Sequence, residues 1–300
     1  MRSLIKNYRQ HKLLYWLCLV VMAYFFVFNY LPMGGLVMAF QNYKPAKGFA
    51  GSAFVGLKHF QKFFSSTYFW RLIRNTLLLG VYDLLFSFPA SILLAFLLNE
   101  VGCNAFKKTI QTVTYMPYFI SLVVICGLIN NFTNSTGFIT TLVKGMGVNC
   151  TSLITMPEAF RAIFTVSNIW QSIGFGSIVY LAALAGVDQQ LYEAARIDGA
   201  GYFRQWLHIT LPGISATIIV MLILRVGQIM NTNFEKVILL YNTSTYETAD
   251  VISSFVYRTG LENGNYSYST AVGLFNSIIS LILVLLTNTF SKHVSEISLF

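Results

Sequence analysis

The chain has 300 residues, of which 55% are hydrophobic and only 10% are charged. A soluble domain carries about 25% charged residues, so this composition excludes a large soluble core and indicates a protein embedded in lipid. The formal net charge of +9 would suit nucleic acid or an anionic membrane surface. The basic residues are dispersed and no recognition motif accompanies them, so we expect no nucleic acid partner.

The N-terminal segment is typical of a retained membrane helix. Basic residues Arg2, Lys6, Arg9 and Lys12 precede a long apolar run from Leu13 to Leu31. That run is too long for the hydrophobic region of a secretory signal, and it ends at a proline instead of a small-residue cleavage site. We therefore predict a first transmembrane helix whose N-terminus is cytoplasmic.

The next segment, Gly34 to Arg74, is mixed and aromatic, and we place it outside the membrane on the external side. Its stretch FVGLKHFQKFF predicts a short amphipathic helix along the membrane face. The lysines in this segment oppose the positive-inside rule, so charge bias alone does not fix the orientation.

The second span, from about Asn75 to Leu98, contains an acidic residue, Asp83. A carboxylate at membrane depth is costly, so it should face the helix bundle and be paired. Arg225, deep in a later apolar run, is the candidate partner. The two intramembrane charges form either a structural ion pair, within the chain or with another subunit, or a gate in a pathway.

A third span covers about Lys108 to Asn131 and is interrupted by Pro117, which permits a bend. The polar stretch from Asn131 to Pro157 is expected to be an external loop. The fourth span covers about Ala159 to Val187, and the fifth covers about Gly213 to Met230.

Amide and indole groups gather in the fourth span, at the end of the fifth and early in the last. Such groups must find partners in the bundle or line a wet cavity. Because sugars bind aromatic faces and amides, the candidate substrate-pathway residues are Trp170, Gln171, Gln228, Asn231, Asn233 and Asn276. The alternative is that Gln171 only bonds across helices, while Gly174 and Gly176 let helices approach closely.

Residues Phe234 to Ser269 are expected outside, with a small helix at Ala249 to Arg258. The last span runs from about Thr270 to Phe290 and ends inside. The sequence thus predicts an all-α integral membrane protein with six transmembrane helices and both ends cytoplasmic.

A polar loop lies between spans four and five. It predicts a cytoplasmic helix-turn-helix, with one helix from Leu191 to Ala200 and a second from about Phe203 to Thr210, ending near Pro212. Asp188 should cap the first helix, and Gly199 and Gly201 should allow a sharp turn. A compact loop of this kind is suited to being held by another protein.

The residues of this loop resemble the signature of permease subunits of bacterial ABC importers. The signature is Glu193-Ala194-Ala195, then Gly199, then Ile209-Thr210-Leu211-Pro212. The fuller run LYEAARIDGAGYFRQWLHITLP resembles the maltose-type, binding-protein-dependent carbohydrate branch. The later run FVYRTGLENGNYSYSTAVGLFNS resembles the subgroup for complex oligosaccharides or polysaccharide fragments. The resemblance extends from about Leu57 to the end.

The resemblance implies a type I ABC importer permease fold in a bacterial plasma membrane. It divides the chain into a peripheral part, residues 1–69, a permease core at 70–293 with the coupling loop at 188–212, and a cytoplasmic tail at 294–300. It also implies that the loop contacts a cytoplasmic ATPase through Glu193, Ala194, Ala195, Asp198, Gly199, Leu211 and Pro212. Expected partners are a second permease in a heterodimer, an ATPase dimer, an external solute-binding protein or lipoprotein, an oligosaccharide and the lipid bilayer.

Enzymatic activity is not expected of this chain. Its four histidines are scattered, no known catalytic motif occurs, and no Gly-Lys dipeptide suggests an ATP-binding loop. We expect no cofactor or metal here, and Mg-ATP in a partner chain. The alternatives are an ABC permease for a non-sugar solute, an ion-coupled secondary transporter, which would need inverted repeats and more buried carboxylates, or a membrane scaffold.

Overall fold

The computed structural model describes residues 11–231 and 233–295. The predicted basic residues Arg2, Lys6 and Arg9, and residues 296–300 of the predicted tail, lie outside the described residues. The chain divides into two compact units: unit 1 contains the residues up to Ser65 and Arg258–Leu274, and unit 2 contains Ser66–Tyr257 and the residues from Phe275 on. The functional boundary at residue 70 stays a prediction.

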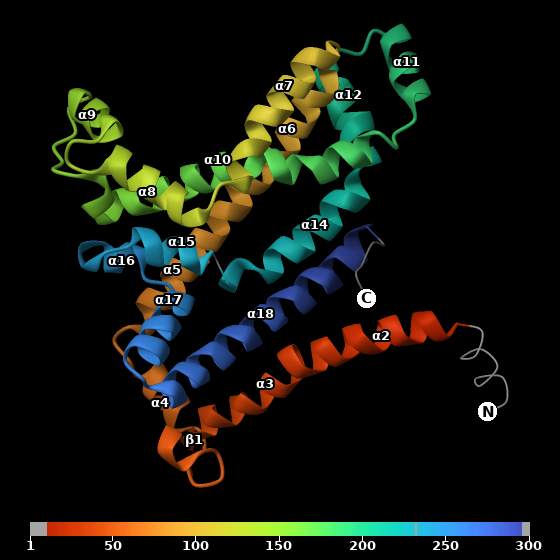
Figure 1. The fold of residues 1–300 in the computed structure, drawn as a ribbon. Helices are drawn as coiled ribbons and strands as arrows, with labels where there is room; N and C mark the ends of the chain where they lie inside the picture. Colours follow the sequence, from red (N-terminus) through yellow and green to blue (C-terminus); the bar gives the residue numbers. More distant parts are fainter. Residues whose placement is uncertain (1–10, 232, 296–300) are drawn as a thin grey trace. The chain divides into compact units, whose positions relative to one another are not determined.

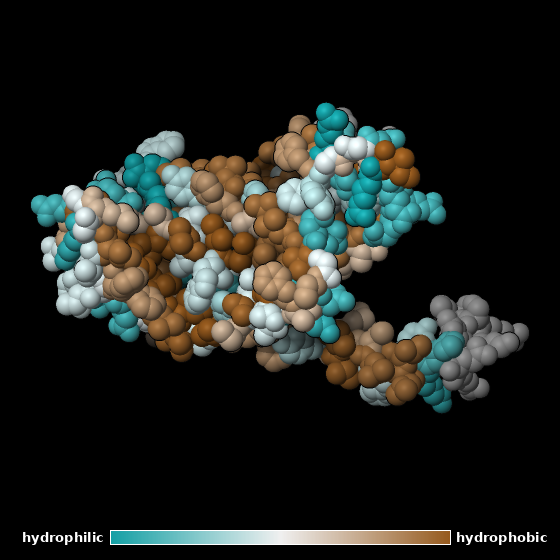
Figure 2. All heavy atoms as spheres, turned by 90° about the horizontal axis from the view of Figure 1, so that it is seen from above, coloured by the Kyte–Doolittle hydropathy of each residue, from teal (hydrophilic) through white to brown (hydrophobic). Residues whose placement is uncertain are grey.

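Unit 1 begins with one long apolar helical segment. It comprises α2 (Lys12–Phe25), η1 (Phe26–Tyr30), α3 (Leu31–Met33) and η2 (Gly34–Phe40). None of the residues of α2 is buried, and Figure 2 shows an apolar surface along most of this arm. A helix with apolar residues on all sides is suited to lipid.

A small external-type module follows in unit 1. Its elements are β1 (Gln41–Asn42), η3 (Pro45–Lys47), β2 (Ala53–Phe54) and α4 (Lys58–Phe64), with β1 and β2 antiparallel. The structure thus has a helix within the predicted amphipathic stretch. The ring Nε2 of its buried His59 lies 3.1 Å from the carbonyl oxygen of Gln41. The Tyr43 amide donates to Ser267 Oγ at 2.8 Å, which joins this module to the second segment of unit 1.

The elements of unit 2 are helical. In order they are α5 (Phe69–Tyr82), η4 (Asp83–Ser87), α6 (Phe88–Glu100), α7 (Asn104–Tyr115), η5 (Met116–Phe119), α8 (Leu122–Thr133), α9 (Phe138–Gly145), η6 (Leu153–Thr155), α10 (Pro157–Leu184), α11 (Gln189–Ile197), α12 (Tyr202–Gln205), η7 (Trp206–Thr210), α13 (Leu211–Gly213), α14 (Ser215–Gly227), η8 (Ile229–Asn231), α15 (Phe234–Leu240), η9 (Thr243–Thr245), α16 (Tyr246–Ala249) and α17 (Ile252–Tyr257). Then η10 (Arg258–Glu262) belongs to unit 1, and α18 (Tyr266–Ser295) begins in unit 1 and continues into unit 2.

Within residues 11–231 and 233–295, five helical segments are long and apolar enough to cross a membrane, or six if one bent pair is counted as a span. The five are Lys12–Phe40, Phe69–Glu100, Leu122–Gly145, Pro157–Leu184 and Tyr266–Lys292. The sixth is Tyr202–Gly213 with Ser215–Gly227, bent by 69°. The predicted class, a helical membrane protein with six spans, is confirmed on this count.

The third span differs from its prediction. We expected one bent helix from Lys108 to Asn131, but the apolar segment of spanning length is Leu122–Gly145, and it includes part of the predicted loop. The helix is fully broken, because Ile120 and Ser121 adopt extended backbone after the turn that contains Pro117. The polar α7 is therefore a separate helix.

Helices α6 and α7 cross α10 closely in unit 2 (Figure 1). A Cβ at Gly174 would lie 2.1 Å from the carbonyl oxygen of Thr114, and one at Gly176 would lie 2.7 Å from Ser91 Oγ. Both glycines thus permit the close contacts of α10 with α6 and α7. The sequence analysis gave such close approach of helices as the alternative explanation of these two glycines.

The small helix expected at Ala249 to Arg258 is present as α17 (Ile252–Tyr257), and it begins after a break at Asp250 that separates it from α16. The backbone of Asp250 is extended, and α16 ends there. Its carboxylate accepts a hydrogen bond from Ser254 Oγ at 2.9 Å, and Ser254 Oγ also receives the Val251 amide at 3.0 Å. These side-chain bonds replace helical backbone bonds at the break.

Candidate functional site

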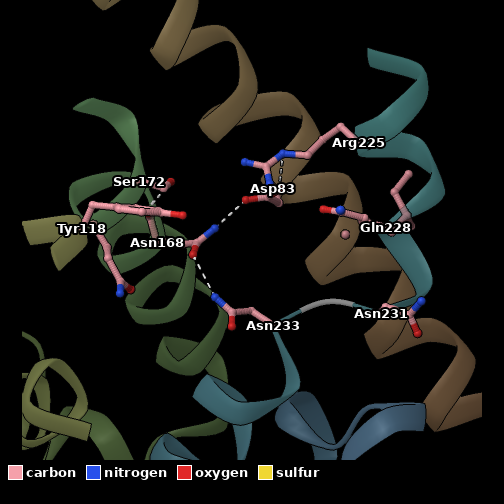
Figure 3. Close-up of a pocket in the computed structure, with 11 residues that line it drawn as sticks. Asp83, Tyr118, Asn168, Ser172, Arg225, Gln228, Asn231 and Asn233 are labelled. Atoms are coloured by element: carbon pink, nitrogen blue, oxygen red, sulfur yellow. Dashed lines mark hydrogen bonds and ion pairs between the residues drawn. The ribbon is translucent and has the colours of Figure 1, made fainter. Parts of the chain in front are cut away.

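A polar pocket of about 330 Å³ opens inside unit 2. It is bounded by the α5–η4 junction, η5, α10 and the chain from α14 to α15. Its lining residues are Gly80, Asp83, Tyr118, Asn168, Gln171, Ser172, Arg225, Gln228, Ile229, Asn231 and Asn233. Figure 3 shows Tyr118 and Ser172 on one side of the pocket, and Arg225 and Gln228 on the other.

The pocket contains the intramembrane ion pair suggested by the sequence. Arg225 Nε lies 3.2 Å from Asp83 Oδ2, and Asn168 Nδ2 donates to Asp83 Oδ1. Asn233 Nδ2 in turn donates to Asn168 Oδ1 at 3.5 Å (Figure 3). The side chain of Asp83 is 15% exposed and that of Arg225 is 35% exposed. One chain of polar contacts thus joins three helical segments at the pocket.

Asp83 begins the π-helical turn η4, between α5 and α6. A π turn inserts one extra residue into the helix and is frequent at functional sites. Gly80, on α5 just before Asp83, lies so close to Ile229 on the facing segment that a Cβ would be 2.8 Å from the Ile229 carbonyl oxygen. The absence of a side chain at Gly80 therefore lets the chain after α14 approach the helix that carries Asp83.

A buried lysine lies behind the pocket wall. Lys236 on α15 is 0% exposed, and its Nζ lies 3.3 Å from Oε1 of the lining residue Gln171. Burial lowers the pKa of Lys236 to about 8. The sequence analysis missed this residue, although a lysine before the apolar run Val237 to Leu240 is a detectable signal.

The pocket also offers an aromatic face. Tyr118 stacks on Phe175 with ring centroids 4.0 Å apart and an interplanar angle of 4°. Beside it, the Ser172 hydroxyl donates to the Asn168 carbonyl oxygen at 2.7 Å. A flat ring beside hydroxyl, amide and charged groups can contact both the C–H faces and the hydroxyls of a polar ligand.

Four of the six predicted pathway residues line this pocket, namely Gln171, Gln228, Asn231 and Asn233. Asn276 lies behind them and donates to Asn231 Oδ1 at 2.9 Å. Trp170 does not join them, because it faces a separate groove that contains Leu128 and Phe132. Trp170 points about 100° around α10 from Gln171, which directs it toward this separate groove. Sequence reasoning did not select Tyr118, Asn168 or Ser172.

The loop at 188–212, predicted to couple to an ATPase, has the expected first helix with shifted ends. Asp188 Oδ1 accepts the Gln190 amide at 2.9 Å and caps α11, which runs from Gln189 to Ile197 instead of from Leu191 to Ala200. Gly199 then has φ +74°, a value that favours glycine. Figure 1 shows α11 at the end of unit 2, beyond α12.

The second loop helix is longer than predicted. Helical backbone runs from Tyr202 to Gly213, through Thr210 and Pro212, before the 69° bend. Pro212 lies in α13, directly after the π turn η7 and just before the bend. The helix thus ends close to Pro212, as expected, three residues beyond Thr210.

Side-chain hydrogen bonds fasten the two loop helices to each other and the second of them to α6. Tyr192 is buried, and its hydroxyl donates to Thr210 Oγ1 at 3.0 Å. Trp206 Nε1 donates to Glu100 Oε1 at 3.2 Å. Glu193, Ala194 and Asp198 are exposed, as are Leu211 and Pro212, while Ala195 is partly buried. The loop thus presents Glu193 on a surface whose opposite side is fastened to α6 and η7.

The sequence matches, over residues 71–296, a family described as the inner membrane component of binding-protein-dependent transport systems. The chain belongs to this family. Its fold and central polar pocket are those of a membrane transport subunit.

Two curated relatives come from Bacillus subtilis (strain 168). Protein LplB is 44% identical over 97% of this chain and 92% of its own length. The polygalacturonan/rhamnogalacturonan transport system permease protein YteP is 45% identical over 98% of this chain and 92% of its own length. The resemblance to ABC importer permeases is thereby confirmed.

Solved structures agree with this assignment. The chain is similar to one in a crystal structure of a bacterial ABC transporter involved in the import of the acidic polysaccharide alginate. The identity is 42% and the TM-score is 0.89, over 98% of this chain and 99% of that chain. A second structure of equal similarity is of the alginate transporter in complex with an alginate pentasaccharide-bound periplasmic protein.

Proposed function

We propose that this chain forms half of the translocation pathway of an ATP-driven importer for oligosaccharides or polysaccharide fragments. The observation that carries the proposal is the polar pocket between α5, α10 and α14, inside a bundle whose spans are otherwise apolar. The names of the relatives, which include a polygalacturonan/rhamnogalacturonan transport system permease and a transporter involved in alginate import, support saccharides as the cargo.

The proposed complex contains a second, similar permease, because six spans are few to enclose a sugar-sized cavity. A dimer of cytoplasmic ATPase subunits would use Mg-ATP, and an external solute-binding protein would deliver the ligand. The periplasmic protein bound to the alginate transporter supports the last of these partners. We place the chain in a bacterial plasma membrane with both termini in the cytoplasm.

In this proposal the loop at 188–212 transmits motion. Glu193 is exposed on α11 and would contact a basic group of the ATPase. Tyr192, bonded to Thr210, would pass displacement of α11 to the helix that leads into α14. ATP closure of the partner would thus bias a two-state shift between inward-open and outward-open spans. Because α14 carries Arg225, the same motion would reach the ion pair in the pocket.

The test is uptake into proteoliposomes that hold both permeases and the ATPase, with the binding protein outside and ATP inside. Labelled oligogalacturonides, alginate oligosaccharides and maltooligosaccharides are offered with ionophores that collapse ion gradients. The proposal predicts ATP-dependent uptake of at least one saccharide. Uptake that needs an ion gradient would support an ion-coupled secondary transporter. Uptake of only non-saccharide solutes would support an ABC permease for a non-sugar solute. Either result contradicts the proposal.

A further inference from the structure

The buried lysine and its glutamine form one polar unit behind the pocket. Lys236 and Gln171 meet at 3.3 Å between Nζ and Oε1, and the Phe164 ring lies 5.8 Å from the same ammonium group. Phe164 and Gln171 are on α10, and Lys236 is on α15, one turn after the lining residue Asn233. The ammonium group is thus held beside the pocket without being exposed in it.

This contact fixes which end of the Gln171 amide faces the ligand. An ammonium group has only donors, so it holds the amide oxygen, Oε1, toward α15. The remaining Nε2 group, which has two donors, is then available to the pocket. Asn168 is oriented similarly, because its Nδ2 donates to Asp83 while its Oδ1 receives Asn233. Gln171 therefore presents a donor, a group that suits an anionic acceptor.

The charges around the pocket do not cancel. Asp83 is occupied by Arg225 and Asn168, so it is the carboxylate of an existing pair. Among the described residues, no carboxylate lies within ion-pair distance of Lys236. Two cations and one anion thus surround the pocket. The buried Lys236 ammonium group has an amide oxygen, an aromatic ring and only the more distant Asp83 carboxylate to offset the cost of its burial, so an anionic ligand would offset this cost further.

We propose that Lys236, acting through Gln171, makes this pocket selective for saccharides that carry a carboxylate, such as uronates, over neutral saccharides of the same length. The inference rests on the proposed function and names the substrate class of that same site. Lys236 is a positioning residue, since its side chain does not line the pocket. Gln171 is the residue that would touch the ligand.

A purely structural role would also be reasonable, because the lysine fastens α15 to α10. The two roles predict different results. A structural role lowers the amount of assembled protein, or lowers transport of every substrate together. A selective role changes the ratio of acidic to neutral transport while the amount of complex stays constant.

The experiment measures uptake by the full complex of an oligogalacturonide and of its carboxyl-reduced counterpart, which has the same length and linkages without charge. The variants are Lys236→Met, Lys236→Arg and Gln171→Glu, and the matched control is Lys144→Met, at an exposed lysine on α9. Each variant is compared at equal amounts of assembled complex, and with the same binding protein.

We expect both Lys236→Met and Gln171→Glu to raise KM for the acidic substrate about tenfold. A change of this size corresponds to the loss of one charge-assisted contact. KM for the neutral substrate should not rise, Lys236→Arg should retain the preference, and Lys144→Met should match wild type. An unchanged ratio in Lys236→Met, or an equal loss for both substrates, overturns the inference while the importer proposal stands. If wild type imports neither saccharide with ATP, the proposed function fails, and this inference fails with it.

Discussion

The pair of Asp83 and Arg225 allows a quantitative test of how the spans are held together. Its two side chains are 15% and 35% exposed, and their atoms are 3.2 Å apart. Removing one partner of a fully buried pair costs about 3–5 kcal/mol, whereas an exposed pair contributes about 0.2–1 kcal/mol. For this half-buried pair we therefore expect Arg225→Met to cost about 2 kcal/mol, because it leaves the Asp83 carboxylate with Asn168 alone.

A double-mutant cycle separates the pair from its surroundings. Unfolding of the purified permease pair in increasing denaturing detergent, followed by tryptophan fluorescence, gives the free energies for Arg225→Met, Asp83→Asn and the double variant. The double variant should be more stable than Arg225→Met, with a coupling energy of about 1–2 kcal/mol. A coupling energy near zero would show that the two groups do not stabilise the fold through each other.

Three further predictions concern packing, backbone and pH. Gly174→Ala should sharply reduce the amount of folded complex in the membrane, because the added Cβ would meet the Thr114 carbonyl oxygen. The control is Gly127→Ala on α8, where an added Cβ meets nothing within 4 Å, and its membrane yield should match that of wild type. Gly199→Val should reduce ATPase coupling more than Gly199→Asn, because Gly199 has φ +74° and asparagine tolerates this left-handed backbone region better than valine. Equal effects of the two variants would count against a backbone cause. Raising the pH through about 8 should deprotonate Lys236, beside Cys126 and Asp83, and so weaken the preference for acidic saccharides. Lys236→Arg should keep that preference at pH 9, and a parallel decline in the arginine variant would assign the effect to another group.

Hydropathy was sufficient to locate most of the spans, although not the bounds of the third, because each long apolar segment must be helical in lipid. It also identified Asp83 and Arg225, since two charges within apolar runs are rare and need each other. The cap at Asp188 and the turn at Gly199 followed from local backbone chemistry. These features depend on neighbouring residues or on composition, so the sequence alone contains them.

The features that were missed depend on tertiary structure. The full break near Pro117 could not be distinguished from a bend, because the extended backbone at Ile120 depends on packing. Trp170 was grouped with Gln171 because the phase of α10 relative to the pocket was unknown. Lys236 was overlooked because its neighbour Glu235 and the polar residues before it suggested an exposed segment, although α15 turns inward and buries it.

The central claim is that the exposed loop helix couples this transport subunit to an ATPase. The most direct measurement compares wild type with Glu193→Ala in ATP-dependent saccharide uptake and in ATPase activity stimulated by the binding protein. Because Glu193 is exposed, the variant should assemble normally and lose both activities together. Normal uptake and normal stimulated ATPase activity in Glu193→Ala would contradict the account.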